Sequence, residues 1–322
     1  MLDGSMSACA EANGVKVGDI TNSASLAITN NFNVPAVDSA KPSLIAKVIS
    51  SVRGALDPLG SARELAEARR LKAESDIEVY DLYRQNMPWL SERQAFLYAN
   101  GFVTTPSQAD NVFAVFEAAE SKIESIDNAN ALPAPVLESV IDGAKRAYDD
   151  EVREMWSAVL AGETESQGSF SKRTLDILSC MSAAEARNFK KLCSYSTSDS
   201  AGLAEVPIVR RDKGSTGSFN DRSILFIDLM ELEAIGLYKS DAAFNIKIEP
   251  GDDLVLHTAK HTIRISPGDN ATTFSIDGGS FTRYGVELSK LCEIGTANGL
   301  EDLICEWASD RGLTSSIDNR TA

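Results

Sequence analysis

The spacing of apolar residues separates a helical stretch of the chain from a stretch with strand-like alternation. From residue 42 to about residue 195, apolar side chains recur every three or four positions, which predicts a succession of amphipathic helices. After residue 195 the period shortens toward two in four short runs bounded by Gly, Pro, Asp or Asn, which predicts a small antiparallel sheet. These runs are 244–248, 254–256, 263–265 and 274–276.

Helices are also predicted around this sheet, at 224–235, 282–294 and 300–307. The order of a helix, then strands, then a helix is similar to that of a winged helix. We therefore expect a mainly α protein, in which an N-terminal and central helical bundle precedes a small C-terminal α+β unit that is winged-helix-like and contains an antiparallel sheet.

The same pattern predicts four parts along the chain. Residues 1–40 are rich in Ser, Asn, Ala and Gly, which predicts a flexible polar arm. Residues 41–88 hold a short amphipathic helix at 42–56 and a long charged helix at 61–86. Because the long helix has few apolar residues with which to join a core, we predict that residues 42–86 mediate self-association. A central helical domain follows at 89–195, and a C-terminal α+β domain at 196–322.

The segment from Asp149 to Leu175 predicts a helix, a loop and a second helix. Asp149 precedes acidic residues that suit a helix N-terminus, and Gly162 is predicted to end that helix. Ser169 or Ser171 is predicted to cap the following helix. Further on, Ser182 and Glu185 have the spacing of a capping box.

The overall charge narrows the classes of partner. With 31 Lys and Arg against 47 Asp and Glu, the net charge is −16. Nucleic-acid binding depends on cations that neutralise phosphates, so this composition disfavours it unless a local basic patch exists. Five widely spaced cysteines without a CxxC pair are typical of reduced thiols, and no apolar run is long enough to span a membrane. We therefore expect a cytoplasmic protein that does not bind membranes.

The loop after Gly168 is the best candidate for an anion site in the chain. Ser169, Ser171, Lys172 and Arg173 place hydroxyl groups and two cations at a predicted helix start, where an anion such as a phosphate could bind. Capping explains the same residue types: Ser171 would cap the helix, Phe170 would pack against it, and the cations would be solvated or paired with acids such as Glu163. Both interpretations stay open.

A second basic stretch lies just before the predicted helix at 224–235. Arg210, Arg211, Lys213 and Arg222 occur there in a Gly- and Ser-rich loop, partly offset by two aspartates. These four residues are the candidates for nucleic-acid contact, within a predicted DNA-binding region at 208–290.

Catalytic and metal-binding patterns are absent from the sequence. The only histidines, His257 and His261, lie about 13 Å apart if they share one continuous strand, or face each other if residues 258–260 form a turn. Neither lies beside a recognisable set of zinc ligands, and no nucleophile elbow or phosphate-binding glycine motif occurs. We assign no catalytic residue, no metal and no cofactor.

One group of motifs is similar to a known family. Asp149–Glu151, Met155–Trp156, Leu160–Glu163 and Gly168–Leu175 resemble the bacterial domain-of-unknown-function family 2806, and more loosely the abortive-infection alpha-type proteins. The resemblance implies a bacterial cytoplasmic accessory protein without established catalytic residues, and the looser one implies a role in phage defence.

Three hypotheses follow for the function. The first is a non-enzymatic oligomeric scaffold or sensor with an unknown protein partner. The second is a winged-helix-like regulator that binds DNA. The third is a protein that binds a phosphate or nucleotide ligand through the loop at 168–174.

Overall fold

The computed structural model describes residues 78–99, 102–123, 130, 132–199, 205–241, 244–276 and 278–320. The predicted arm at 1–40, the helix at 42–56 and most of the helix at 61–86 lie outside these residues. Of the predicted self-association segment, only residues 78–86 are described, and they are helical.

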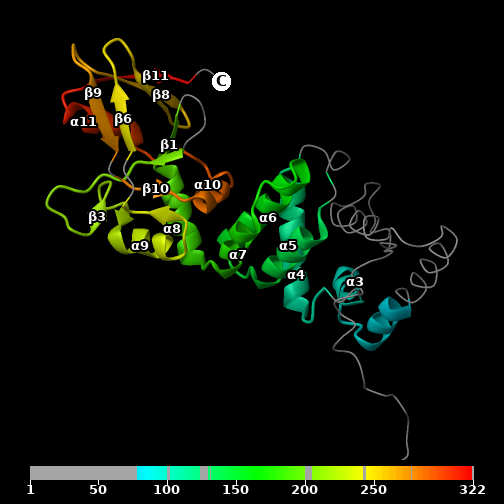
Figure 1. Ribbon diagram of the computed structural model, residues 1–322. Coiled ribbons are helices and arrows are strands. Elements are labelled where there is room, and N and C mark those ends of the chain that lie inside the picture. Colours follow the sequence, from blue (N-terminus) through cyan, green and yellow to red (C-terminus); the bar gives the residue numbers. More distant parts are fainter. Residues whose placement is uncertain are drawn as a thin grey trace, which may run out of the picture.

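After the helical segment at 78–86, six named helices follow in the first half of the structure (Figure 1). They are α3 (Glu92–Ala99), α4 (Pro106–Glu120), α5 (Ala134–Arg146), α6 (Asp150–Glu165), α7 (Lys172–Cys180) and α8 (Ala183–Ser194). In Figure 1, α4, α5 and α6 lie side by side, and α7 and α8 lead from them to the sheet-containing part.

Local capping explains where most of these helices begin. Ser171 accepts a hydrogen bond from the Thr174 N–H, and Ser182 forms the predicted capping box with Glu185. The expectation that Gly162 ends a helix is wrong, because α6 continues to Glu165. A Cβ at Gly162 would lie 3.2 Å from the Phe170 ring, so the glycine makes room for that ring instead.

The first hydrophobic core includes Trp156, which is the largest fully buried side chain of the described residues and is 1% exposed. A Cβ on Gly143 would lie 2.1 Å from the Trp156 ring, so only glycine lets α5 approach α6 this closely. The same core also includes Leu229, Leu232 and Leu288 from beyond residue 195. A domain boundary between 195 and 196 remains a prediction, and this core takes side chains from both sides of it.

The second half alternates strands with three helices. The strands are β1 (Ser196–Asp199), β2 (Glu205–Pro207), β3 (Ser218–Phe219), β4 (Ile224–Leu225), β5 (Tyr238–Lys239), β6 (Phe244–Ile248), β7 (Leu254–His257), β8 (His261–Ser266), β9 (Thr272–Ile276), β10 (Ser280–Phe281) and β11 (Thr314–Asn319). The helices are α9 (Phe226–Ala234), α10 (Arg283–Ser289) and α11 (Leu300–Ser309).

These strands form one larger sheet and several two-stranded pairs. The larger sheet has five antiparallel strands in the order β11-β8-β7-β1-β2, and the pairs are β10-β5, β3-β4 and β6-β9. A second core is formed by this sheet, the β6-β9 pair and α11, where Trp307 of α11 and Phe274 of β9 contact each other with ring centroids 6.0 Å apart.

The expectation of a mainly α protein with a small winged-helix-like unit is wrong. The sheet is larger than predicted because two of its strands have no alternating apolar pattern: β1 reads STSD, and β11 reads TSSIDN with every residue exposed. Their backbones pair with neighbouring strands, and side-chain periodicity does not reveal such pairing. The predicted helix at 224–235 is also shorter, because Ile224 and Leu225 pair with β3.

Helices long and apolar enough to cross a membrane are absent from the described part of the chain.

Candidate functional site

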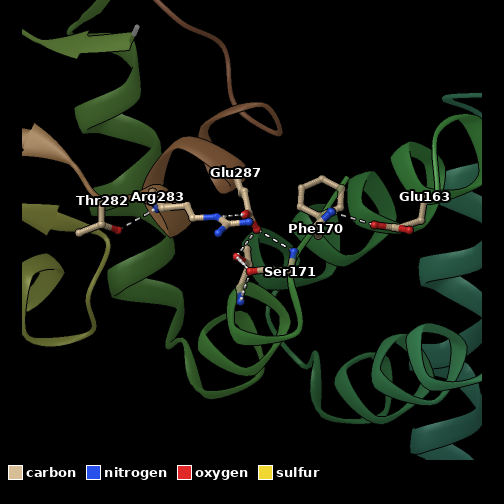
Figure 2. Close-up of polar contacts among 8 residues, drawn as sticks. Glu163, Phe170, Ser171, Thr282, Arg283 and Glu287 are labelled. Atoms are coloured by element: carbon tan, nitrogen blue, oxygen red, sulfur yellow. Dashed lines mark hydrogen bonds and ion pairs between the residues drawn. The ribbon is translucent and has the colours of Figure 1, made fainter. Parts of the chain in front are cut away.

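The segment at 168–174 consists of the end of the loop between α6 and α7 and the first residues of α7, and two carboxylates, one from α6 and one from α10, accept its hydrogen bonds (Figure 2). Glu163, which is fully buried on α6, accepts hydrogen bonds from the Gly168 N–H at 2.9 Å and the Phe170 N–H at 2.8 Å. The Glu163 carboxylate therefore accepts hydrogen bonds from both of these backbone N–H groups.

Glu287 of α10 occupies the other side of the loop, at the N-terminus of α7. Its Oε2 accepts hydrogen bonds from the Ser171 N–H at 2.7 Å and the Thr174 hydroxyl at 2.5 Å. Arg283 donates to its Oε1 at 3.2 Å, as Figure 2 shows. Burial by itself raises the pKa of Glu287, but the hydrogen bonds from Thr174, Ser171 and Arg283 outweigh it and lower the pKa below 4.5. An ionised carboxylate thus lies where a helix start could hold an external anion.

The four residues predicted for the anion site have different surroundings. Ser171 is the cap of α7, and Ser169 donates its hydroxyl to the Ser166 carbonyl at 2.7 Å. Lys172 and Arg173 are exposed and form no ion pair with any residue in the described ranges. The alternative that pairs these cations with Glu163 does not occur, because that carboxylate is buried against the loop backbone. An external anion would have to displace Glu287, and the anion site stays a prediction.

The four residues predicted for nucleic-acid contact come together around one pocket. Its volume is about 430 Å³, and Leu303 and Glu306 of α11 are among the residues that line it. The remaining lining residues all come from one loop: Arg210, Arg211, Asp212, Lys213, Asp221 and Arg222. We call this cavity the basic pocket.

The loop around the basic pocket has an unusual backbone that its own side chains stabilise. Asn220, Asp221 and Arg222 all have positive φ, at 52°, 54° and 64°. The Asp212 carboxylate accepts hydrogen bonds from the Asp221 N–H at 2.7 Å and the Arg222 N–H at 2.9 Å. Buried Asn220 bridges the Arg210 N–H and the Ile208 carbonyl. Such a run of left-handed residues is costly and persists only where the surroundings impose it.

Hydrogen bonding also keeps Asp212 ionised. Burial raises the pKa of this carboxyl, but hydrogen bonds from Ser218 and from the Arg222 and Asp221 backbones, with the charge of Arg222, lower it below its ordinary value. The charged Asp212 carboxylate therefore stabilises the backbone conformation of the loop.

The cations of the basic pocket differ in how they are paired. Arg210 forms ion pairs with Glu306 and Asp310 of α11, which fasten the loop to that helix. The Arg211 guanidinium lies 5.5 Å from the centre of the Phe219 ring. Arg211, Lys213 and Arg222 form no ion pair with any residue that the structure describes. Three cations thus remain available to a ligand.

Sequence patterns alone missed Leu303 and Glu306. They lie about ninety residues beyond Arg210, on a helix predicted only for its apolar face. No local signal links α11 to the loop, because tertiary packing alone brings them together.

The two histidines belong to separate hydrogen-bonded pairs. β7 and β8 form a hairpin, so residues 258–260 are a turn, and His257 contacts the Thr262 hydroxyl at 3.0 Å. His261 lies 2.9 Å from Glu301, whose carboxylate also accepts from Thr258. In the ranges that the structure covers, no group of three or more His, Cys, Asp or Glu residues could hold a metal ion.

Comparison with known proteins identifies a family without a described activity. No curated protein and no solved structure matches the chain. A family model described as "Protein of unknown function (DUF2806)" matches residues 103–300 and so covers the helical core, both loops and the basic pocket up to α11. This match spans more than half of the 322 residues, and the chain belongs to that family.

Proposed function

We propose that the protein is a non-enzymatic cytoplasmic sensor that binds a nucleotide in the basic pocket. The observation that carries the proposal is the convergence on one cavity of about 430 Å³ of Arg211, Lys213 and Arg222, none of which forms an ion pair with a described residue. Cavities of roughly 300–1,000 Å³ suit small molecules and cofactors. Arginine and lysine are the side chains that bind phosphate groups most strongly.

The carboxylates of the pocket favour a nucleotide over free phosphate. Asp221 and Glu306 line the same cavity as the cations. A nucleotide carries ribose hydroxyls and base amino groups, which donate hydrogen bonds to carboxylates, as well as phosphates, which accept them from cations. Inorganic phosphate would use only the cationic half of the pocket.

The overall charge favours a small ligand over duplex DNA. A duplex contacts a wide surface, and a chain of net charge −16 repels phosphates over most of that surface. A ligand in the pocket meets the local charge, where the four cations Arg210, Arg211, Lys213 and Arg222 outnumber the three lining carboxylates. The DNA-binding hypothesis for 208–290 therefore becomes the alternative outcome of the same test.

Isothermal titration calorimetry with nucleoside mono-, di- and triphosphates tests the proposal. We expect at least one nucleotide to bind, and the Arg222→Gln substitution to weaken binding about tenfold, as loss of a charge-assisted contact does. No detectable binding of any nucleotide would refute the proposal. A shift of labelled duplex DNA at low salt that Arg222→Gln abolishes would favour DNA instead.

A second candidate function is self-association, for which the helical segment at 78–86 provides support. Tyr80 and Tyr83 are partly buried, and the Tyr83 ring contacts the Tyr98 ring, whereas Val79 and Leu82 are exposed on the same segment. Trp89, just beyond it, is 71% exposed. An exposed apolar surface of this kind is typical of a protein interface.

Size-exclusion chromatography with light scattering tests this candidate. We expect the full chain to be oligomeric and the Leu82→Glu/Trp89→Glu variant to dissociate, because a charge on each side chain opposes burial. Tyr148→Glu, at another exposed aromatic residue, is the matched control and should leave the mass unchanged. A monomeric full chain would exclude self-association.

A further inference from the structure

The five-stranded sheet has one protected edge and one open edge. At one end, β2 has three residues, of which Val206 and Pro207 are buried, and proline has no N–H with which to pair a further strand. At the other end, the six residues of β11 are all exposed, and none of them is Pro or Lys (Figure 1). Proline and lysine are among the features that protect edge strands from pairing with another chain. β11 therefore leaves this sheet open to a further strand.

The pairing of β11 with β8 shows which backbone groups face outward. The Arg320 N–H donates to the Lys260 carbonyl at 2.9 Å, and this pair of residues continues the register between the two strands. Successive residues of an antiparallel strand direct their backbone groups to opposite sides, so every second residue counted back from Arg320 faces β8. The N–H and C=O groups of Ser315, Ile317 and Asn319 therefore face outward, where the sheet has no further strand.

An identical strand matches these outward groups in one register. When Ile317 lies opposite Ile317 of a second copy, Ser315 lies opposite Asn319 of that copy, and Asn319 lies opposite its Ser315. Each of these pairs can exchange two hydrogen bonds, because all their backbone groups point toward the other strand. A shift of the register by two residues in either direction loses one of these pairs.

The charge on the strand favours the same register. Asp318 is the only charged residue of β11, and it lies opposite Ser316 of the second copy, whose hydroxyl can donate to the carboxylate. A shift by two residues in one direction would place Asp318 opposite its own copy, and like charges directly opposite destabilise a sheet. Arg264 of β8, 3.4 Å from Asp318, further offsets this charge. The net charge of −16 on each copy then acts at longer range, where salt screens it.

Ile317 provides an apolar centre for the pairing. It is 43% exposed, although it lies beside Ile263 of β8, which is fully buried. Among the described residues it is the only exposed large apolar side chain on the five-stranded sheet. In the register above, the Ile317 side chains of the two copies lie on the same face of the sheet and cover each other.

We propose that two copies of this chain associate through β11, so that five strands from each copy form one continuous sheet around a two-fold axis. A strand of another protein could form the backbone hydrogen bonds, but an identical strand also supplies the Ile317 contact and, twice, the contact of Asp318 with Ser316. Because β2 is buried, each copy has one open edge in this sheet, and assembly ends at two copies. The proposal requires neither the nucleotide site nor the segment at 78–86.

Sedimentation equilibrium of the full-length protein over a range of concentrations tests the proposal. A pair of six-residue strands is a small interface, so we expect a weak dimer, seen as a mean mass that rises with concentration. Ser315→Pro removes an outward N–H but no hydrogen bond to β8, and it should raise the dimer Kd at least about tenfold. Ser315→Ala keeps that N–H, is the matched control and should dimerise as the wild type does.

A second variant, Ile317→Lys, leaves every backbone group in place. Two lysines at the two-fold axis repel each other, so this change should also raise the dimer Kd at least about tenfold while the circular dichroism spectrum stays unchanged. The Leu82→Glu/Trp89→Glu variant should still form the β11 dimer, and adding Ser315→Pro to it should give a monomer. If Leu82→Glu/Trp89→Glu alone is monomeric, the β11 proposal is wrong and the candidate interface at 78–86 stands. A dimer Kd that neither Ser315→Pro nor Ile317→Lys changes would also overturn the proposal.

Discussion

Two loops of this protein have similar composition and different surroundings. The loops at 168–174 and 210–222 both combine small hydroxyl residues with Lys and Arg near the start of a helix. In the first, Glu163 and Glu287 already bind the donors, and Lys172 and Arg173 face solvent. In the second, the cations line a pocket. Similar loop compositions thus have different surroundings, because carboxylates from α6 and α10 accept the hydrogen bonds of the first loop, whereas three cations of the second loop line a cavity, where we propose that a nucleotide binds.

The largest expected effect tests whether the first loop is structural. Glu163→Ala removes a buried acceptor from two N–H groups and should lower the free energy of unfolding by about 2–4 kcal/mol. Glu165→Ala, at an exposed position of the same helix, is the control and should change it by less than about 0.5 kcal/mol. Urea denaturation followed by circular dichroism measures both. Equal effects would show that Glu163 does not stabilise the loop.

The next prediction compares the cations of the two loops directly. Lys213→Gln/Arg222→Gln should raise the Kd of a bound nucleotide by about ten- to a hundredfold, equivalent to about 1.4–2.8 kcal/mol. Lys172→Gln/Arg173→Gln removes the same charge from the first loop and should leave the Kd unchanged. Titration calorimetry measures the Kd of both variants. A larger increase for Lys172→Gln/Arg173→Gln would mean that the first loop, and not the second, binds the nucleotide.

A pH dependence should distinguish Glu287 from exposed carboxylates. Its pKa is lowered in the folded protein, so its stabilisation is present above about pH 4.5 and disappears as the pH falls through the lower folded-state pKa. Glu287→Gln should therefore cost about 1–2 kcal/mol at pH 7 and progressively less in acid.

Denaturation curves across this pH range measure the difference between Glu287→Gln and the wild type. Glu293→Gln, at an exposed position, is the control. A constant difference between Glu287→Gln and the wild type would mean that the charge of Glu287 does not contribute.

The smallest expected effect concerns backbone conformation in the two loops. Gly168 has φ +80° with open space around its Cα, so Gly168→Ala should cost about 1 kcal/mol through backbone strain alone. Asp221 has φ 54°, and Asp221→Gly should raise the stability by up to about 1 kcal/mol as that strain is relieved. Thermal melts of the two variants should shift in opposite directions. If the melting temperatures of both variants shift in the same direction, the backbone of the second loop is not strained at Asp221.

Features encoded within a few residues were predictable from the sequence. The Ser182–Glu185 capping box and the cap at Ser171 each depend on three or four successive positions, and the alternation in β8 shows in its own residues. The four cations of the basic pocket were recognisable as a group for the same reason. The polar strands β1 and β11 were not predicted, because they form through backbone pairing with strands distant in the sequence and have no alternating apolar pattern of their own.

Neighbouring residues encode helical periodicity, the serine caps at Ser171 and Ser182 and the cations of the two loops, so the sequence was enough to predict these features, although not the helix end near Gly162. The groups that surround each loop depend on the tertiary structure. Packing brings Glu287 to Ser171 across 116 residues, and Glu306 to Arg210 across 96. A carboxylate fills the first loop, and a helix completes the wall of the pocket beside the second. These contacts depend on how distant helices pack, which no pattern within either loop records.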